Sequence, residues 1–139
     1  MALCSELKTL FIGQTTVDEV WSGEGLGSPD AVLYPDKRKR VVGGMAANSS
    51  AVYSQLGDAA DEVSLYAVLG KDREAEQIVA WLQEQSVDTQ LVVHDPKTHT
   101  PKAFIWADTI TGHRHVFYDE ASLSLLTSEY IANAVDHSR

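Results

Sequence analysis

The sequence predicts an α/β fold built on a parallel sheet with flanking helices and an attached β hairpin. Three observations predict this class. Short apolar runs alternate with segments of helical periodicity in the order strand, helix, strand, helix, strand, which is typical of parallel strands joined by right-handed crossovers. Two adjacent glycines stand directly before the first helix. A pair of aromatic-rich strands around a short turn follows the last crossover.

The first part of the chain predicts three short strands. An apolar run from Leu7 to Ile12 is the first, and it ends at Gly13. The polar stretch that follows leads to Asp18, which we expect at the carboxyl end of this strand. After a glycine-rich segment, 31–34 and 40–42 are predicted as short, partly exposed strands.

The first helix is predicted from Ala46 to Leu56. Ala47, Ala51 and Val52 recur at helical spacing, and Gly57 stands where a glycine commonly ends a helix. A strand from Val63 to Leu69 comes next.

A second helix and a further strand complete the alternating pattern. The helix is predicted from Arg73 to Gln85 because its apolar residues form one stripe, and the strand is predicted from Val87 to Val93. The order of these elements makes the sheet parallel.

The last third of the chain predicts a hairpin and a helix. Strands at Ala103–Ala107 and His115–Tyr118 flank a turn that contains Gly112. Leu125 then leads into a helix with Thr127 or Ser128 as its N-cap.

Composition restricts the classes of function. The 139 residues, 44% of them hydrophobic, suffice for one domain with a core or for part of a larger one. The formal net charge of -9 repels phosphate backbones and anionic lipid, so we expect neither nucleic acid nor a membrane as partner. The one basic run, Lys37 to Arg40, is interpreted as a solvated segment leading into a strand.

Cysteine content and hydropathy suggest a compartment. Cys4 is the only cysteine, so no internal disulfide can form. No segment approaches the roughly 18 apolar residues of a membrane span. We therefore expect a cytoplasmic location.

The glycine pair, Gly43 and Gly44, predicts a binding site at the start of the first helix. Glycines allow a ligand to approach the backbone closely, and the first N–H groups of a helix point outward with partial positive charge. Hydroxyls or anions suit such a place. The third glycine of a dinucleotide-binding fingerprint is missing, so a nicotinamide enzyme is not expected. Gly70-Lys71 is followed by Asp72 instead of the Ser or Thr of a P-loop, so a P-loop is not expected either.

This stretch resembles the first signature of the ribokinase-like carbohydrate kinases, the PfkB family. The segments "FIGQTTVDEV", "VSLYAVLGKDREAEQIVAWLQEQSVDT" and "TPKAFIWADTITGHRHVFYDEASLSLLT" are similar to further parts of the family, so the resemblance spans nearly the whole chain. Within the family, ketohexokinases are the most similar in spacing. The matching residues of the first signature are Gly43, Gly44, Ala46, Asn48, Ser50 and Gly57.

The resemblance implies a ribokinase-like fold with a small β lid, whose strands cover approximately 31–42 and 103–118. It also implies that 1–139 is the N-terminal portion of one kinase domain and that the C-terminal, nucleotide-binding half is absent. The family's second signature, which carries an anion hole and the catalytic base, is not found, so the base is expected beyond Arg139. The stretch 108–112 imitates the opening of that signature, but its hairpin context makes it a turn, and we assign it no catalytic role.

The resemblance further implies which residues bind the acceptor. Asp18, the backbone of Gly43 and Gly44, and Asn48 would hold the hydroxyls of a small sugar. Phe104 and Arg114 would approach it from the lid. These residue types suit the task, because a carboxylate accepts from two hydroxyls and an amide both donates and accepts.

The identity of the acceptor stays open at this stage. Met45 stands where members of the family often have a polar residue, which puts the substrate in doubt. His113 and His115 are interpreted as hairpin packing and not as a metal pair. ATP and Mg²⁺ are implied for the complete enzyme only, and this chain alone is expected to hold neither and to be inactive.

The implied function is ATP-dependent phosphorylation of a sugar hydroxyl by the complete protein. Three alternatives remain. The chain could be a non-catalytic fragment that binds sugar or forms a dimer through the lid hairpin, part of a nucleoside kinase of the same superfamily, or a nucleotide-binding regulator without a sugar site.

Overall fold

The computed structural model describes residues 8–27, 30–57, 61–119 and 126–137. Cys4, Leu7 and Leu125 lie outside these ranges. The α/β class with parallel strands is confirmed. The elements are β1 (Lys8–Ile12), β2 (Thr16–Gly23), β3 (Lys37–Gly43), α1 (Met45–Leu56), β4 (Glu62–Tyr66), β5 (Val68–Leu69), α2 (Arg73–Glu84), β6 (Val93–His94), β7 (Lys102–Asp108), β8 (Arg114–Asp119) and α3 (Ser128–His137).

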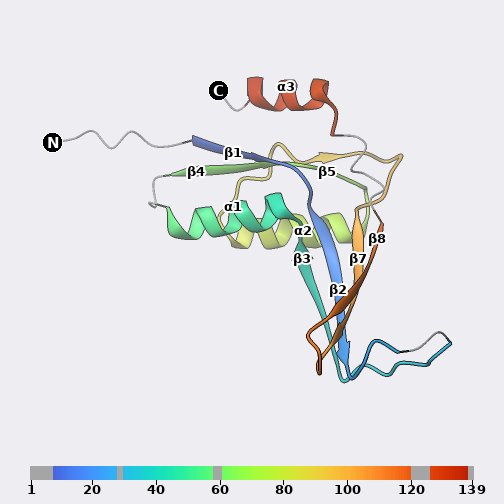
Figure 1. The fold of residues 1–139 in the computed structure, drawn as a ribbon. Coiled ribbons are helices and arrows are strands. Elements are labelled where there is room, and N and C mark those ends of the chain that lie inside the picture. The colour runs from blue at the N-terminus through green and yellow to red at the C-terminus, as the bar shows by residue number, and fades with distance from the viewer. Residues whose placement is uncertain (1–7, 28–29, 58–60, 120–125, 138–139) are drawn as a thin grey trace.

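The molecule consists of a layered α/β core and a four-stranded sheet that extends away from it (Figure 1). In the core, β1 pairs in parallel with β4, and β5 pairs in parallel with β6. Helices α1 and α2 lie on one side of these strands and α3 lies on the other. The extending sheet, which we call the lid sheet, has the strand order β3-β2-β7-β8.

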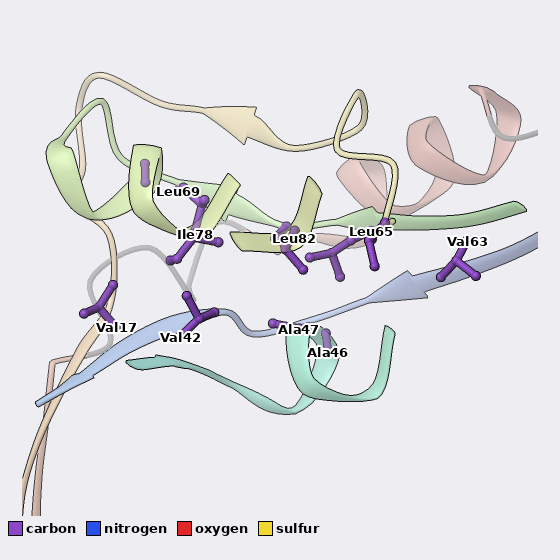
Figure 2. Packing of buried hydrophobic residues seen from close by; sticks show 12 residues of the cluster. Val17, Val42, Ala46, Ala47, Val63, Leu65, Leu69, Ile78 and Leu82 are labelled. Atoms are coloured by element: carbon purple, nitrogen blue, oxygen red, sulfur yellow. The ribbon is translucent and has the colours of Figure 1, made fainter. Parts of the chain in front are cut away.

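The main hydrophobic cluster lies between the core strands and helices α1 and α2 (Figure 2). Leu65 of β4 and Ile78 and Leu82 of α2 are fully buried there. Val17 and Val42, from the first residues of the lid sheet next to the core, join the same cluster. Because these two valines are buried with α2, the base of the lid sheet is part of the core.

A second cluster covers the opposite face of the core strands. Tyr66 and Val68 pack there with Leu10 and Ile12 of β1 and with Leu126, which precedes α3. Strand β1 is therefore covered by apolar side chains on both faces. No helix in the described ranges is both long and apolar enough to cross a bilayer.

The strand predicted at 31–34 was wrong. These residues are irregular, and the basic run Lys37–Arg40 is itself most of β3. The reason is that β2 is eight residues long and offers β3 a partner along 16–22. Asp18 consequently lies inside β2, and not at the carboxyl end of β1 as expected.

The strand predicted at 87–93 was also mostly wrong. Only Val93 and His94 form a strand, and Asp88 makes a single bridge to Ser64. The Asp88 carboxylate accepts a hydrogen bond from the Gln90 N–H at 3.0 Å, which forms a turn where the apolar pattern suggested an extended chain. The two helices, the hairpin and the helix at Ser128 agree with their predictions.

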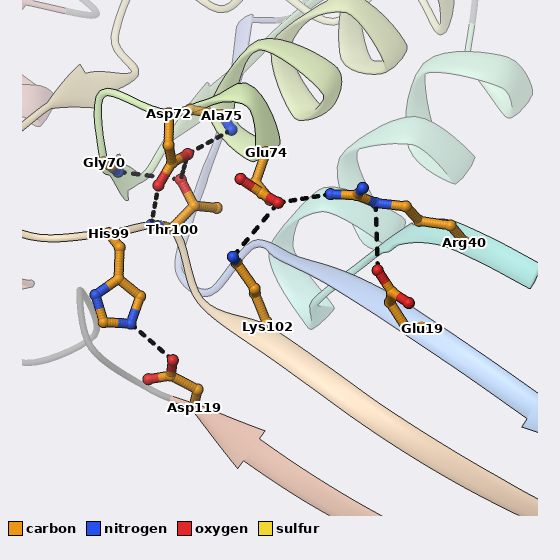
Figure 3. Close-up of polar contacts among 10 residues, drawn as sticks. All are labelled: Glu19, Arg40, Gly70, Asp72, Glu74, Ala75, His99, Thr100, Lys102 and Asp119. Carbon is orange, nitrogen blue, oxygen red and sulfur yellow. Dashed lines mark hydrogen bonds and ion pairs between the residues drawn. The ribbon is translucent and has the colours of Figure 1, made fainter.

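The N-terminus of α2 is held by a hydrogen-bonded group centred on Asp72 (Figure 3). One carboxylate oxygen accepts from the Ala75 N–H at 2.9 Å and from the Thr100 hydroxyl at 2.7 Å. The other accepts from the Thr100 N–H at 2.8 Å, and Thr100 is fully buried. Burial raises the pKa of Asp72, but the hydrogen bonds from Thr100 and Ala75 and the charge of Lys102 outweigh it and leave the pKa below its usual value.

We expect Asp72→Asn to lower the free energy of unfolding by about 1–2 kcal/mol at neutral pH, because its amide has a single accepting oxygen and cannot replace both carboxylate oxygens, one of which accepts from the Ala75 N–H and the other from the Thr100 N–H. Since the folded-state pKa is lowered, this stability is present above the unfolded pKa of about 4 and is lost as pH falls through the folded value. Urea unfolding between about pH 6 and pH 2 should show a smaller acid-induced loss in the variant than in the wild type. Asp88→Asn, at an exposed turn, is the control that should change neither quantity. An equal loss in both variants would contradict the prediction.

Candidate functional site

The lid sheet has two faces of different chemistry, and its register assigns residues to each. On one face, Asp18 of β2 stands beside Ala103 of β7, and Ala103 beside Tyr118 of β8. Two residues further along, Val20, Ile105 and Val116 are neighbours in the same way. Side chains alternate between faces along a strand, so these rows share one face, which we call the inner face.

The opposite, outer face is aromatic. Here Glu19, Phe104 and Phe117 form one row, and Trp21 and Trp106 belong to the next. Phe104 meets Trp21 edge to face at a centroid distance of 5.0 Å. Phe104 was expected beside the acceptor, but the structure places it on the other side of the sheet from Asp18, because it is one residue out of phase with Ala103 and Ile105.

The glycine pair makes room for Asp18 and for the turn after β1. A Cβ atom on Gly43 would lie 2.2 Å from an oxygen of the Asp18 carboxylate. Gly44 has φ of 92°, and a Cβ there would lie 2.5 Å from the backbone oxygen of Gln14. That oxygen accepts a hydrogen bond from the Ala46 N–H at 3.2 Å. Both glycines are therefore required by close approach, Gly43 to a side chain and Gly44 to the backbone.

A pocket of about 300 Å³ lies between the inner face and the start of α1. It brings together four of the expected residues, Asp18, Gly44, Asn48 and Arg114, whereas Gly43 lies behind the Asp18 carboxylate. The lining residues are Gln14, Thr16, Asp18, Gly44, Met45, Asn48, Ala103, Ile105, Arg114, Val116 and Tyr118.

The polar groups of the pocket lie toward its two ends. Asp18 is half-buried and accepts a hydrogen bond from the Thr16 hydroxyl at 2.7 Å, and Asn48 is exposed in the first turn of α1. Arg114 is four residues further along the sheet than Asp18, which corresponds to roughly 13 Å at the usual strand rise. A ligand that touches both groups would have to extend along the lid.

Sequence reasoning missed the middle of the pocket. Ile105, Val116 and Tyr118 line it, and Met45 at its rim is 82% exposed. Counting by twos from Arg114 would have found Val116 and Tyr118, and the same alternation along β7 separates Ile105 from Phe104. That signal could not be used without the register that relates β2 to β7.

An ionic group at the base of the lid sheet faces α2 (Figure 3). The Glu74 carboxylate of α2 pairs with Arg40 of β3 at 2.8 Å and with Lys102 of β7 at 3.4 Å. Burial raises the pKa of Glu74, but its own backbone N–H, Arg40 and Lys102 outweigh this and hold the pKa below its usual value. One carboxylate thereby ties down the two strands that flank β2, the strand that carries Asp18.

Asp108 is used by the hairpin turn. Its carboxylate accepts from the Thr111 hydroxyl at 2.5 Å and from the N–H groups of Ile110 and Gly25, both at 2.9 Å. The Thr111 hydroxyl is the main reason that the pKa of Asp108 lies below its usual value. This geometry agrees with the interpretation of 108–112 as a turn.

The donor set of the pocket does not suit a resident metal. Within the described ranges, no three His, Cys, Asp or Glu side chains form a group that could hold a metal ion.

Comparison with known proteins gives the family. Residues 7–137 match the profile of the pfkB family carbohydrate kinases. A nucleoside kinase of Methanothermobacter thermautotrophicus is 25% identical over 130 residues, which cover 94% of this chain and 41% of the kinase. The crystal structure of Sa239 shares the fold with a TM-score of 0.81 at 21% identity, over 95% of this chain and 42% of that one.

A ligand-bound relative shares the fold as well. Arabidopsis thaliana ribokinase, solved with ribose and ATP, superimposes with a TM-score of 0.71 at 17% identity, over 84% of this chain and 36% of that one. The chain thus spans about two fifths of the length of these proteins. The chain belongs to the pfkB family of carbohydrate kinases, and its fold is ribokinase-like.

Proposed function

We propose that this chain is the acceptor-binding portion of a kinase that transfers the γ-phosphoryl group of ATP to a sugar hydroxyl. The observation that carries the proposal is the pocket of about 300 Å³ in which Asp18, Gly44 and Asn48 converge beneath the inner face of the lid sheet. The family assignment gives the class of reaction.

Each polar group has a task that its chemistry allows. The Asp18 carboxylate accepts hydrogen bonds from two neighbouring hydroxyls, with Thr16 holding its other side. The Asn48 amide donates to one hydroxyl oxygen and accepts from another. Arg114 lies roughly 13 Å along the sheet from Asp18, so it binds the far end only of an acceptor that extends along the lid. Together these groups orient the reacting hydroxyl, which is the main protein contribution to phosphoryl transfer besides charge stabilisation.

The donor side of the reaction is assigned to polypeptide outside residues 1–139. ATP with Mg²⁺ supplies the phosphoryl group and neutralises its charge, and a base must accept the hydroxyl proton. In this proposal, 1–139 is the N-terminal portion of one kinase domain and the nucleotide half and the base are separate from it. A cytoplasmic location belongs to the same proposal.

We expect purified 1–139 to bind an acceptor without phosphorylating it. Ribose, fructose or adenosine at a hundred times its dissociation constant should stabilise the fold by about 2.7 kcal/mol, which thermal unfolding detects as a raised Tm. A coupled assay with ATP and Mg²⁺ should show no turnover above buffer. Turnover at the rate of a complete kinase would contradict the assignment of the base, and no stabilisation by any of the three would contradict the acceptor site.

A nucleoside is the second candidate for the acceptor, and the apolar part of the pocket favours it. Met45, Ile105, Val116 and Tyr118 form a surface beside Asp18 that suits the flat ring of a base better than a free sugar. The relative from Methanothermobacter thermautotrophicus is named a nucleoside kinase. Competition among the three ligands in the unfolding assay separates the candidates, since a nucleoside acceptor requires adenosine to be the tightest.

Dimerisation through the lid hairpin is also part of the proposal. It applies both to a complete kinase and to a non-catalytic fragment. The outer face carries an apolar hollow of about 260 Å³, and Phe117 at its edge is 64% exposed. Aromatic side chains at such a place are favoured at interfaces.

We expect Phe117→Asp to weaken self-association at least about tenfold, as loss of an aromatic anchor does. Sedimentation velocity over a concentration series measures the change. Leu56→Asp alters an exposed apolar residue on α1, remote from the lid, and is the matched control. A wild-type chain that is monomeric at every concentration would refute the dimer.

A further inference from the structure

The pocket beneath the lid sheet is built from two parts of the molecule. Asp18, Ile105 and Arg114 belong to the lid sheet, whereas Gly44 and Asn48 belong to the start of α1. The lid sheet extends away from the core that contains α1 (Figure 1). The separation between the two sets of pocket residues therefore depends on the angle that the lid sheet makes with the core.

Helix α2 holds the lid sheet on the face opposite to the pocket. Val17, at the base of this sheet, is buried in the main hydrophobic cluster together with residues of α2. Val17 stands beside Lys102 of β7, and Glu19, two residues further along β2, stands beside Arg40 of β3. Because side chains alternate along a strand, Arg40 and Lys102 share the outer face, while Asp18 lies on the inner face.

The next contact between α2 and the lid sheet is ionic and is made by Glu74 (Figure 3). One oxygen of its carboxylate lies 2.8 Å from Nη2 of Arg40 and 3.4 Å from Nζ of Lys102. The Glu74 side chain is only 18% exposed, so these pairs are screened less than pairs on an open surface. Arg40 also lies 3.9 Å from Glu19, which extends the network to β2. We call these four residues, Glu19, Arg40, Glu74 and Lys102, the Glu74 clamp.

The clamp lies at the base of a long sheet. Strand β7 runs six residues from Lys102 to Asp108, which is roughly 20 Å at the usual strand rise. A small rotation at Lys102 therefore becomes a large displacement at the hairpin turn. Asp18 and Arg114 would move with the sheet, whereas Asn48 would stay with α1. A contact that fixes the base of the sheet thus also fixes the separation of the two parts of the pocket.

We infer that Glu74 is a positioning residue of the acceptor pocket, which sets the angle of the lid sheet through Arg40 and Lys102. Without the clamp the sheet adopts a range of angles, and only some of them present Asp18 and Asn48 to the same ligand. The apparent Kd rises as the fraction of competent molecules falls. The effect on ligand binding rests on the proposed acceptor site, whereas the effect on the lid sheet does not.

Distances between spin labels test the effect on the lid sheet. Ile110→Cys in the hairpin turn and Leu56→Cys on α1 carry the labels, because these positions are 71% and 82% exposed, and Cys4→Ser removes the native thiol. Dilution with unlabelled chain limits the measurement, by double electron–electron resonance, to distances within one molecule. Glu74→Gln should broaden the distribution by about 3 Å, the displacement that a rotation of roughly 10° produces at the end of a strand about 20 Å long.

Glu76→Gln is the matched control for the distances. Glu76 is exposed in the same first turn of α2, so its substitution removes the same charge from the start of the helix and leaves the clamp intact. Arg40→Gln breaks the clamp from the lid side and should broaden the distribution as Glu74→Gln does, and the double variant should broaden it no further. Should Glu74→Gln fail to fold, the comparison of Arg40→Gln with Glu76→Gln decides. An unchanged distribution in either clamp variant, or an equal broadening in Glu76→Gln, overturns the inference.

Titration calorimetry with ribose, fructose and adenosine provides the readout on the pocket. Glu74→Gln should raise Kd about three- to tenfold, which corresponds to a competent fraction of about a third to a tenth of the wild-type value, and Glu76→Gln should leave Kd unchanged. A broadened distribution with an unchanged Kd overturns the positioning role. A wild-type chain that binds none of the three ligands contradicts the proposed acceptor site instead, and the distances still decide whether the clamp holds the lid sheet.

Discussion

Asp18→Asn is expected to weaken acceptor binding about 10- to 100-fold, which is the cost of losing charge-assisted hydrogen bonds of about 1.5–3 kcal/mol. The amide keeps one oxygen for the Thr16 hydroxyl, so the fold should be unaffected. The other position becomes a donor, which cannot accept from a ligand hydroxyl. Titration calorimetry with ribose, fructose and adenosine measures the change in Kd.

Glu19→Gln is the matched control for this experiment. Glu19 is the next residue on β2 and belongs to the outer face, where its carboxylate lies 3.9 Å from Arg40. The same loss of charge one residue away should leave Kd within about twofold, because the Glu19 side chain belongs to the face opposite the pocket and Glu19 does not line it. If both variants weaken binding equally, the acceptor is not held by the inner face.

Gly44→Ala is expected to have the largest effect on stability, about 3–4 kcal/mol and a fall in Tm of about 10 °C. Two penalties add at this position. A φ of 92° is strained for alanine, and the new Cβ would lie 2.5 Å from the Gln14 oxygen and 2.7 Å from the Thr15 Cα. Both atoms belong to the backbone between β1 and β2, so neither can rotate away.

Gly112→Ala separates the two penalties. Gly112 has a φ of 73°, and nothing lies within 4 Å of the place that its Cβ would take. Gly112→Ala should lower the free energy of unfolding by only about 1 kcal/mol, because it carries the conformational penalty without a steric clash. Thermal and urea unfolding of both variants gives the comparison. A Gly44→Ala variant no less stable than Gly112→Ala would mean that the turn after β1 can move freely.

The elements that were predicted correctly carry a strong local pattern. The apolar stripe of α2 predicts that its residues face the core, and Ile78 and Leu82 of this stripe are buried. The glycine pair predicted a close approach, and the structure shows what approaches, a carboxylate and a backbone turn. Family resemblance predicted acceptor-binding roles for Asp18 and Asn48; the structure places both at one pocket, and the roles themselves stay predictions.

The errors concern features that only pairing decides. The run Lys37–Arg40 is highly polar and has no apolar alternation, yet it is a strand because β2 offers it a partner. Phe104 is an aromatic residue of the hairpin, which suggested a lid contact with the acceptor. The face of the lid sheet on which its side chain lies depends on the register between β7 and β2. A shift of one residue would have exchanged Phe104 with Ile105, and no local signal in the sequence determines that shift.

The aromatic outer face gives this protein a built-in optical signal. Of its three tryptophans, Trp21 and Trp106 lie on the outer face of the lid sheet, and Trp81 packs against the core from α2. A partner that covers the outer face should shift the emission to shorter wavelength without any label. An acceptor bound on the inner face contacts none of the three indoles. Intrinsic fluorescence therefore distinguishes assembly through the lid from ligand binding beneath it.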